Sequence, residues 1–223
     1  MVLENCKLTY FGIAGRGEAT RLALSIGKVQ FNDDRVNFKN WAELKPTTPW
    51  GSLPMLSLSD GTVIAQQRTM LRLVGKETGL YPTDSIAAAK VDELMDASED
   101  IGAVTMKAGV GLAKEEKEAA RKAYCEEGGK TYEVLQMIDQ KIGSNDAGPF
   151  AVGDSVTIAD LCIYCNCNNL VSGLYDGVPA NTLDAFENLT ALRKAVRSHS
   201  SVVKWYEELD SSITTMPASY GVL

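Results

Sequence analysis

A tyrosine and an arginine near the start of the chain, Tyr10 and Arg16, are the residues whose types and spacing are best suited to chemistry. Tyr10 ends a stretch in which apolar and polar residues alternate, as in a half-buried strand. Gly12, Gly15 and Gly17 then allow a sharp backbone turn before a helical pattern begins. This order predicts that the Tyr10 hydroxyl lies at the carboxyl end of a strand, beside a helix N-terminus. Ligands of open α/β sheets bind there, and a neutral tyrosine hydroxyl donates hydrogen bonds.

Other candidate groups do not predict a site. The glycines have the wrong order for a dinucleotide-binding fingerprint, and the Lys-Ser/Thr of a phosphate-binding loop is missing. Cys162, Cys165 and Cys167 have no second ligand pair, and on a helix Cys167 points away from Cys165, so we expect no metal site. His199, the single histidine, stands in a polar segment and is expected in a solvated turn.

The first part of the chain predicts a mixed α/β layer. We expect strands at 6–11, 29–38, 53–58 and 62–65, helices at 18–26 and 66–78, and a short helix or turn at 41–45. The order begins with a strand–helix–strand unit and ends with two strands and a helix. This order predicts a thioredoxin-like domain over 1–79, with a helix crossover between the first two strands.

From residue 86 the pattern is helical. Helical periodicity covers 86–110, 114–142, 158–174, 190–198 and 201–209. Thr157 and Asp160 form a capping-box pattern that opens the apolar helix at 158. Residues 80–85, with Pro82, are expected to be a linker, and 86–223 an all-α domain.

Composition narrows the class of protein. The chain has 223 residues, of which 45% are hydrophobic and 23% charged, as in an ordinary globular protein. The formal charge of −7 argues against a nucleic-acid partner, which requires a basic surface. No apolar run is long enough to span a membrane. Without an apolar signal segment, and with five cysteines, an odd number, the chain is expected in the cytoplasm with reduced thiols.

Four segments together resemble a known family. They are residues 10–21, 41–56, 60–67 and 153–160, in matching order and spacing. The chain is thereby similar to the cytosolic glutathione S-transferases, and most similar to the sigma class, which includes the haematopoietic prostaglandin D synthases. The resemblance implies a homodimer that uses glutathione as co-substrate and adds its thiol to small hydrophobic electrophiles.

The resemblance also assigns roles to individual residues. Tyr10 matches the tyrosine that stabilises the glutathione thiolate, and Arg16 the arginine that assists it. Other residues match the family's glutathione-binding positions: Trp41 and Lys45 at the glycyl end, Leu53 and a cis Pro54 beside the cysteinyl backbone, and Gln66 and Gln67 at the γ-glutamyl carboxylate. Glu99 and Asp100 match an acidic pair that reaches across a dimer to the glutathione amine. The positions expected around the electrophile are Gly12, Ile13, Met106, Lys107, Val110, Gly111 and Cys162.

The chain departs from the family pattern at a few of these positions. Gln67 stands where the family usually has serine, so the hydroxyl donor to the γ-glutamyl carboxylate is missing, although the Gln67 amide and backbone N–H can replace it. Ser52 stands where the sigma class often has lysine. Lys107 and Cys162 replace an aromatic residue and a tyrosine of the prostaglandin D synthases, which argues against prostaglandin isomerase activity.

The sequence therefore predicts a glutathione transferase in which Tyr10 activates the thiol. Two alternatives stay open. One is a glutathione-dependent isomerase or peroxidase on the same fold, and the other is a non-catalytic ligand carrier or crystallin-like relative.

Overall fold

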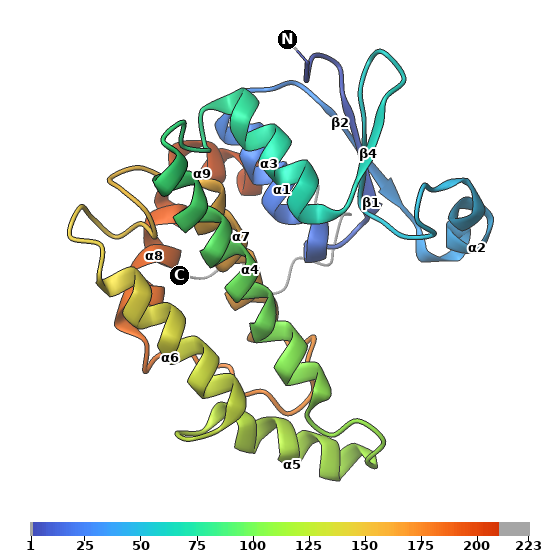
Figure 1. Cartoon of the computed structure of the whole chain (residues 1–223). Coiled ribbons are helices and arrows are strands. Elements are labelled where there is room, and N and C mark those ends of the chain that lie inside the picture. Colours follow the sequence, from blue (N-terminus) through green and yellow to red (C-terminus); the bar gives the residue numbers. More distant parts are fainter. Residues whose placement is uncertain (1, 210–223) are drawn as a thin grey trace. The chain divides into compact units, whose positions relative to one another are not determined.

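The computed structural model describes residues 2–209, which form two compact units (Figure 1). The first unit runs to Pro82 and takes up the chain again from His199, and the second runs from Thr83 to Ser198. The last part of the predicted second domain, residues 210–223, lies outside the described residues. Each unit is described by itself.

A four-stranded mixed sheet forms the centre of the first unit. Its strands are β1 (Lys7–Phe11), β2 (Asn32–Val36), β3 (Met55–Ser57) and β4 (Val63–Ala65), in the spatial order β2-β1-β3-β4. β1 is parallel to β2 and antiparallel to β3, which in turn is antiparallel to β4. The parallel register sets Tyr10 opposite Arg35. All four predicted strands are present, although each is shorter than its apolar pattern.

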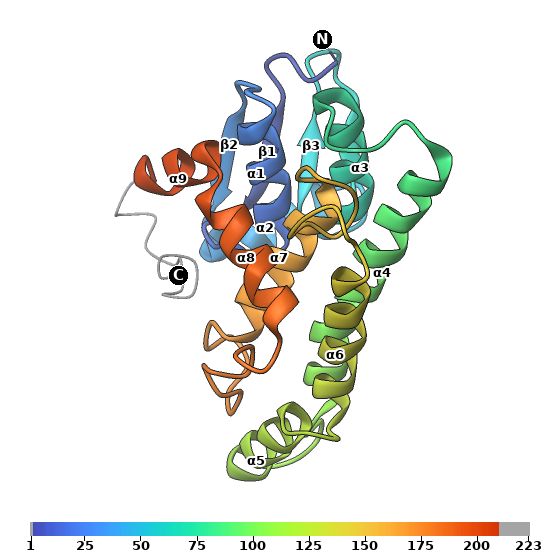
Figure 2. The same cartoon turned by 90° about the vertical axis from the view of Figure 1, so that its left-hand side faces the viewer.

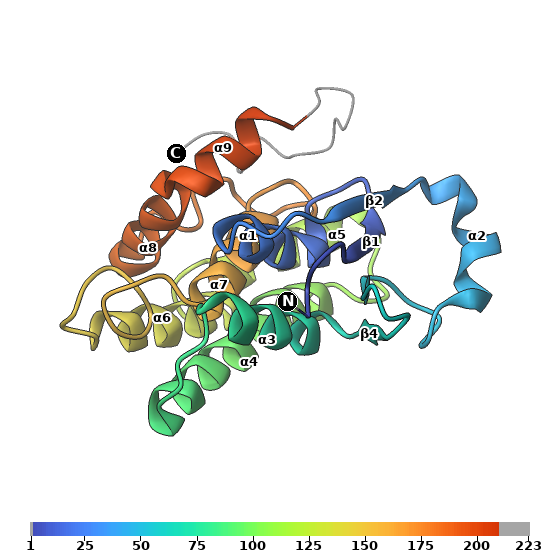
Figure 3. The ribbon, with the colours of Figure 1, turned by 90° about the horizontal axis from the view of Figure 1, so that it is seen from above.

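Two helices cover one face of this sheet, and a short helix lies on the other (Figure 3). α1 (Glu18–Ile26) and α3 (Gln67–Thr78) pack together on the first face, and α2 (Trp41–Leu44) lies on the second. Single 3₁₀ turns at Gly15–Gly17, Phe38–Asn40 and Lys45–Thr47 join these elements. α1 has the bounds that the glycine turn and the apolar spacing predict. Its buried side contributes Leu22 and Leu24 to the core.

The last described helix, α9 (Ser200–Glu207), belongs to the first unit and packs beside α1 (Figure 3). The Ser25 hydroxyl of α1 donates a 3.2 Å hydrogen bond to the Ser201 carbonyl. His199 caps α9, because its Nδ1 accepts a hydrogen bond from the Ser201 N–H at 3.3 Å. The helix predicted at 201–209 is therefore confirmed. The sequence pattern does not predict that this helix packs against α1.

Five helices make up the second unit, α4 (Ser85–Lys107), α5 (Lys114–Cys125), α6 (Lys130–Gly143), α7 (Ile158–Leu170) and α8 (Glu187–Ser198) (Figure 2). α4 packs against α6 and α7, and α8 packs against α6 and α7. The continuous helical pattern over 114–142 divides at Gly128 and Gly129. Gly128 has a positive φ of 81°, a conformation that interrupts a helix.

α7 is the buried helix of the second unit, and the Asp160 carboxylate caps it. The carboxylate accepts hydrogen bonds from the Ala151 N–H at 2.7 Å and from the Thr157 N–H and hydroxyl at 2.7 and 2.8 Å. The predicted capping box is confirmed. An α/β unit with a thioredoxin-like sheet followed by an all-α unit is the fold class that the sequence predicts.

Within residues 2–209, no helix combines the length and the apolar character needed to cross a membrane.

Candidate active site

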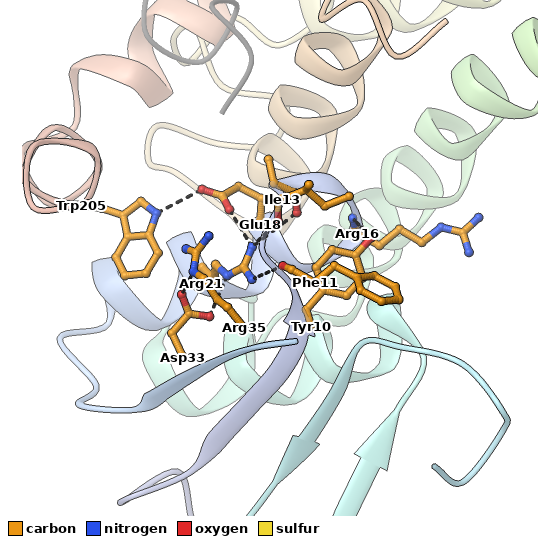
Figure 4. Close-up of polar contacts among 10 residues, drawn as sticks. Tyr10, Phe11, Ile13, Arg16, Glu18, Arg21, Asp33, Arg35 and Trp205 are labelled. Atoms are coloured by element: carbon orange, nitrogen blue, oxygen red, sulfur yellow. Dashed lines mark hydrogen bonds and ion pairs between the residues drawn. The ribbon is translucent and has the colours of Figure 1, made fainter. Parts of the chain in front are cut away.

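The Tyr10 ring lies against the glycine turn that follows β1 (Figure 4). Its hydroxyl oxygen accepts a 3.1 Å hydrogen bond from the backbone N–H of Arg16, and the side chain is 7% exposed. A Cβ atom added to Gly17 would lie 2.7 Å from Tyr10 Cδ1, and one added to Gly15 would lie 2.6 Å from the hydroxyl oxygen. The glycines are thus required for the close approach of the ring to the backbone as well as for the turn.

The hydroxyl hydrogen of Tyr10 is available to a ligand. Among residues 2–209, the hydrogen bond from Arg16 is the only one recorded for this hydroxyl, and there the Tyr10 oxygen is the acceptor. The Arg16 side chain is exposed and extends away from the buried residues behind the turn (Figure 4). The turn therefore presents one O–H donor and carries one exposed guanidinium cation, which are groups that stabilise an anion.

Arg21 holds the turn from its buried side. Its Nη1 donates to the Ile13 carbonyl at 2.8 Å, and its Nη2 donates to the Phe11 carbonyl at 3.2 Å. The guanidinium carbon also lies 5.7 Å from the centroid of the Tyr10 ring, within the range of a cation–π interaction. Arg21 thus fixes the backbone on both sides of Gly12.

Charged partners surround the Arg21 guanidinium. Glu18 Oε2 lies 3.1 Å from Nη1, and Asp33 Oδ1 lies 2.9 Å from Nε. Arg35 Nε binds the other Asp33 oxygen at 2.6 Å. Burial by itself lowers the pKa of Arg21, but the carboxylates of Glu18 and Asp33 outweigh it and raise that pKa above its ordinary value. Arg21 therefore stays charged although its side chain is fully buried.

An aromatic cluster connects α2 to the end of β1. Phe11 stacks on Phe38 with ring centroids 4.4 Å apart, and meets Trp41 edge-on at 5.5 Å. Trp41 is therefore brought next to the residue that follows Tyr10. Lys45, at the C-terminal end of α2, is exposed.

Leu53 and Pro54 lie immediately before β3, where both are buried. The peptide bond between them is cis, as the family resemblance implies. The ladder between β1 and β3 ends at the pair Thr9 and Met55, so Leu53 and Pro54 follow it toward the carboxyl end of β1. Ser52, before them, is exposed.

Gln66 and Gln67 lie at the N-terminus of α3. Gln66 is the N-cap residue, with φ 72° and ψ 114°, a backbone conformation that non-glycine residues rarely adopt. Such strain is concentrated at functional sites. The first N–H groups of a helix lack intrahelical acceptors, and together with the helix dipole they favour an anion.

The second unit carries Asp100, Met106 and Cys162. Asp100 and Met106 are exposed on α4, and Met106 is 58% exposed. Cys162, on α7, is fully buried, and its Sγ lies 3.5 Å from the Ser98 hydroxyl. Because helices of its own unit cover this thiol, we do not include Cys162 among the ligand-binding residues proposed below.

The protein's own thiols are poorly suited to act as nucleophiles. None of the five cysteines forms a disulfide, and all five are buried. Burial raises the pKa of Cys167 to about 12 and also raises the pKa values of Cys6 and Cys125. Three or more His, Cys, Asp or Glu side chains are nowhere grouped as metal ligands within the described part of the chain.

Sequence reasoning missed the residues behind the turn. Glu18 and Arg21 belong to the segment that carries the family resemblance, and their spacing of three residues is that of a helical ion pair. That signal does not reveal their burial, nor the hydrogen bond that Trp205 donates to Glu18 at 3.0 Å.

Comparison with known proteins places the chain among glutathione transferases. The family model described as "Glutathione S-transferase, C-terminal domain" matches residues 104–208. Glutathione S-transferase 1 of Ascaris suum is 32% identical over 202 residues, covering 91% of this chain and 95% of the relative. The haematopoietic prostaglandin D synthase of Gallus gallus is 28% identical over 207 residues, covering 92% of this chain and 97% of the relative. A crystal structure of the glutathione S-transferase from Ascaris lumbricoides has a TM-score of 0.76 at 31% identity, covering 92% of this chain and 97% of that one.

Proposed function

Since the chain belongs to the glutathione S-transferase family, we propose that it binds glutathione, stabilises the thiolate with the Tyr10 hydroxyl, and adds this thiolate to hydrophobic electrophiles. The observation that carries the proposal is the state of Tyr10. Its hydroxyl oxygen is fixed by the Arg16 N–H while its hydrogen is available to a ligand at the end of β1.

The energy required of the site is modest. A free thiol has a pKa of about 8.5, so only a few per cent is thiolate at neutral pH. Lowering this pKa by about two units takes roughly 2.7 kcal/mol of stabilisation of the anion relative to the thiol. A hydrogen bond to a charged sulfur contributes about 1.5–3 kcal/mol. One bond from Tyr10, assisted by the positive charge of Arg16, is therefore sufficient.

Glutathione also carries two carboxylates, for which the first unit offers partners. We assign the γ-glutamyl carboxylate to Gln66, Gln67 and the N-terminus of α3, where free N–H groups are expected. We assign the glycyl carboxylate to Lys45 and Trp41. The backbone of Leu53, held before the cis Pro54, is proposed to pair with the cysteinyl backbone.

The remaining assignments follow the family. Gly12 and Ile13, in the turn, are proposed to contact the electrophile, for which an apolar surface is suitable. We propose a sigma-class homodimer in which Asp100 of the partner subunit contacts the glutathione amine. Buried cysteines without disulfide bonds support a reducing compartment, and we propose the cytoplasm.

Two measurements on the purified chain test this proposal. We expect retention on immobilised glutathione with elution by free glutathione, and conjugation of glutathione to a chloronitrobenzene. Gln67→Ala should raise the KM for glutathione about fivefold, because one anion contact is lost. Lys28→Ala, on an exposed turn of the same unit, is the matched control and should leave KM unchanged. Failure both to bind glutathione and to turn over would reject the proposal.

A glutathione-dependent isomerase is the second candidate function. It is favoured by the 28% identity to a haematopoietic prostaglandin D synthase. Both functions use the same thiolate and differ in the electrophile. Conversion of a prostaglandin endoperoxide without conjugate formation would favour the isomerase, and conjugation without isomerisation would favour the transferase.

A further inference from the structure

A continuous line of hydrogen bonds connects α9 to the turn beside Tyr10 (Figure 4). The indole Nε1–H of Trp205 donates to Glu18 Oε1 at 3.0 Å. The other carboxylate oxygen, Oε2, accepts from Arg21 Nη1 at 3.1 Å. Arg21 then donates to the carbonyls of Ile13 and Phe11 at 2.8 and 3.2 Å. Trp205 and Glu18 are 187 residues apart in the sequence but lie in the same compact unit.

We propose that Trp205 is a positioning residue for the thiolate-stabilising tyrosine and acts through Glu18 and Arg21 on the turn that holds the Tyr10 ring. This inference rests on the proposed function of Tyr10. It adds that a residue of the last described helix, without contact to the reacting atoms, sets the efficiency of the site.

The buried carboxylate makes the indole necessary. The Glu18 side chain is fully buried, and a buried charge is costly unless hydrogen-bond donors satisfy it. Trp205 satisfies Oε1, which leaves Oε2 for Arg21. Arg21 Nη1 serves both Glu18 Oε2 and the Ile13 carbonyl. If the indole donor is lost, Glu18 draws more strongly on Nη1, and the hydrogen bond to the turn weakens.

The turn transmits this change to Tyr10 because its ring is packed against the backbone. Gly15 and Gly17 approach the ring closely, and the Arg16 N–H between them is hydrogen-bonded to the hydroxyl. A shift of about 1 Å in a catalytic group can reduce a rate by two orders of magnitude. A looser turn therefore places the donor less accurately against the sulfur, with little effect on the residues that bind the glutathione carboxylates.

Trp205→Phe tests the proposal, because it keeps an aromatic ring beside Phe31 but removes the N–H donor. We expect kcat for conjugation to fall about fivefold while the KM for glutathione changes less than about twofold. The apparent pKa of the bound glutathione thiol should rise by about half a unit. Amide hydrogen exchange at Arg16 should become about tenfold faster, because its hydrogen bond to Tyr10 opens more often.

Phe31→Leu is the matched control. The Phe31 ring stacks on Trp205 with centroids 5.9 Å apart, but it makes no part of the hydrogen-bonded line. We expect a change in stability without a change in kcat, thiol pKa or exchange at Arg16. A fall in kcat in this variant equal to that in Trp205→Phe would overturn the proposal, since general packing would then explain both.

A double-mutant comparison with Glu18→Gln tests whether Trp205 acts on the turn through Glu18. If Trp205 acts through Glu18, adding Trp205→Phe to Glu18→Gln should lower kcat no further. If the kcat losses of Trp205→Phe and Glu18→Gln add in the double variant, the proposal is contradicted. It is also contradicted if amide hydrogen exchange at Arg16 in Trp205→Phe is as slow as in the native protein. Should the native protein show no turnover, the exchange measurement still reports the coupling, so failure of the proposed function remains distinguishable. Should Glu18→Gln not fold, the comparison of Trp205→Phe with Phe31→Leu decides.

Discussion

The backbone N–H of Arg16 donates a 3.1 Å hydrogen bond to the Tyr10 hydroxyl oxygen. A donor on the oxygen polarises the O–H bond and makes the hydroxyl a stronger donor in turn, since hydrogen bonds in a chain strengthen one another. It also fixes the oxygen, so that the hydroxyl does not have to be ordered when a ligand binds. The glycine turn therefore orients the proposed thiolate donor and also connects β1 to α1.

Gly17→Ala should impair catalysis by displacing the tyrosine. The new Cβ would lie 2.7 Å from Tyr10 Cδ1, closer than van der Waals contact allows, so that the ring or the turn must move. We expect kcat/KM for conjugation to fall about tenfold or more. Steady-state kinetics on protein verified as folded by circular dichroism measure this effect.

The control for that substitution is Gly27→Ala, at the end of α1. An added Cβ there would collide with Thr78 Cγ2, so that α1 and α3 must shift, far along the helix from Tyr10. This variant should lose stability, by about 1–3 kcal/mol, but keep kcat per folded molecule. Equal loss of kcat in both variants would show that any repacking of α1 disables the site.

Gln66→Gly should stabilise the fold and weaken glutathione binding. Gln66 has φ 72° and ψ 114°, a conformation that is less strained for glycine because it has no Cβ, so the substitution relieves strain. Strain of this kind costs about 1–3 kcal/mol, partly offset by the entropy of glycine in the unfolded chain. We expect a net gain near 1 kcal/mol in denaturant unfolding, with a higher KM for glutathione because the side chain is lost.

Lys28→Gly is the control that separates the relief of backbone strain from the loss of a glutathione-binding side chain. Lys28 also has a positive φ, 55°, but lies on an exposed turn after α1. It should gain stability to a similar degree with an unchanged KM. If Gln66→Gly leaves KM unchanged as well, Gln66 does not contact glutathione through its side chain.

Asp160 should make the stability of the protein depend on pH. Burial raises the pKa of Asp160 to about 6, although hydrogen bonds from Ala151 and Thr157 oppose the rise. In the unfolded chain the pKa of Asp160 is near 3.8. Between about pH 4 and pH 6, Asp160 is therefore protonated in the folded state but ionised in the unfolded state. The contribution to stability is thus largest below about pH 4 and is lost as the pH rises through about 6, by roughly 3 kcal/mol.

Asp160→Asn does not titrate and isolates this effect. The difference in unfolding free energy between native protein and variant should shrink from about pH 4 to about pH 7, measured by denaturant titration. Asp154→Asn, exposed in the preceding loop, is the control and should give a difference nearly independent of pH. If the difference in unfolding free energy between native protein and Asp160→Asn instead grows with pH, the hydrogen bonds from Ala151 and Thr157 outweigh burial and lower the pKa of Asp160.

Much of the fold could be predicted because local signals agree with the tertiary structure. Glu18–Ile26 has its predicted bounds, since the glycines before it and Gly27 after it leave no competing assignment. The capping box at Thr157 and Asp160 is likewise a short-range pattern that the structure realises. The strand predicted at 29–38 is only Asn32–Val36, because its pairing with β1 begins at Asn32, opposite Lys7, and ends at Val36, opposite Phe11.

Long-range contacts account for what could not be predicted. The Glu18 carboxylate meets the Trp205 indole although no local pattern relates them. The spacing of Glu18 and Arg21 does not reveal that both side chains are fully buried. The family resemblance sets Cys162 beside the electrophile, but it does not reveal that the Cys162 thiol is buried next to the Ser98 hydroxyl. Burial and distant partners are properties of the folded chain.

The most direct test of the account is glutathione conjugation by Tyr10→Phe, compared with the native protein across pH. Phenylalanine keeps the ring against Gly17 and removes only the hydroxyl. We predict turnover by the native protein and a loss of at least about tenfold in the variant near neutral pH, or about 1.4 kcal/mol of transition-state stabilisation. The apparent pKa of the bound thiol should rise toward that of free glutathione. Unchanged turnover with an unchanged pH profile would contradict the assignment and place the thiolate donor elsewhere.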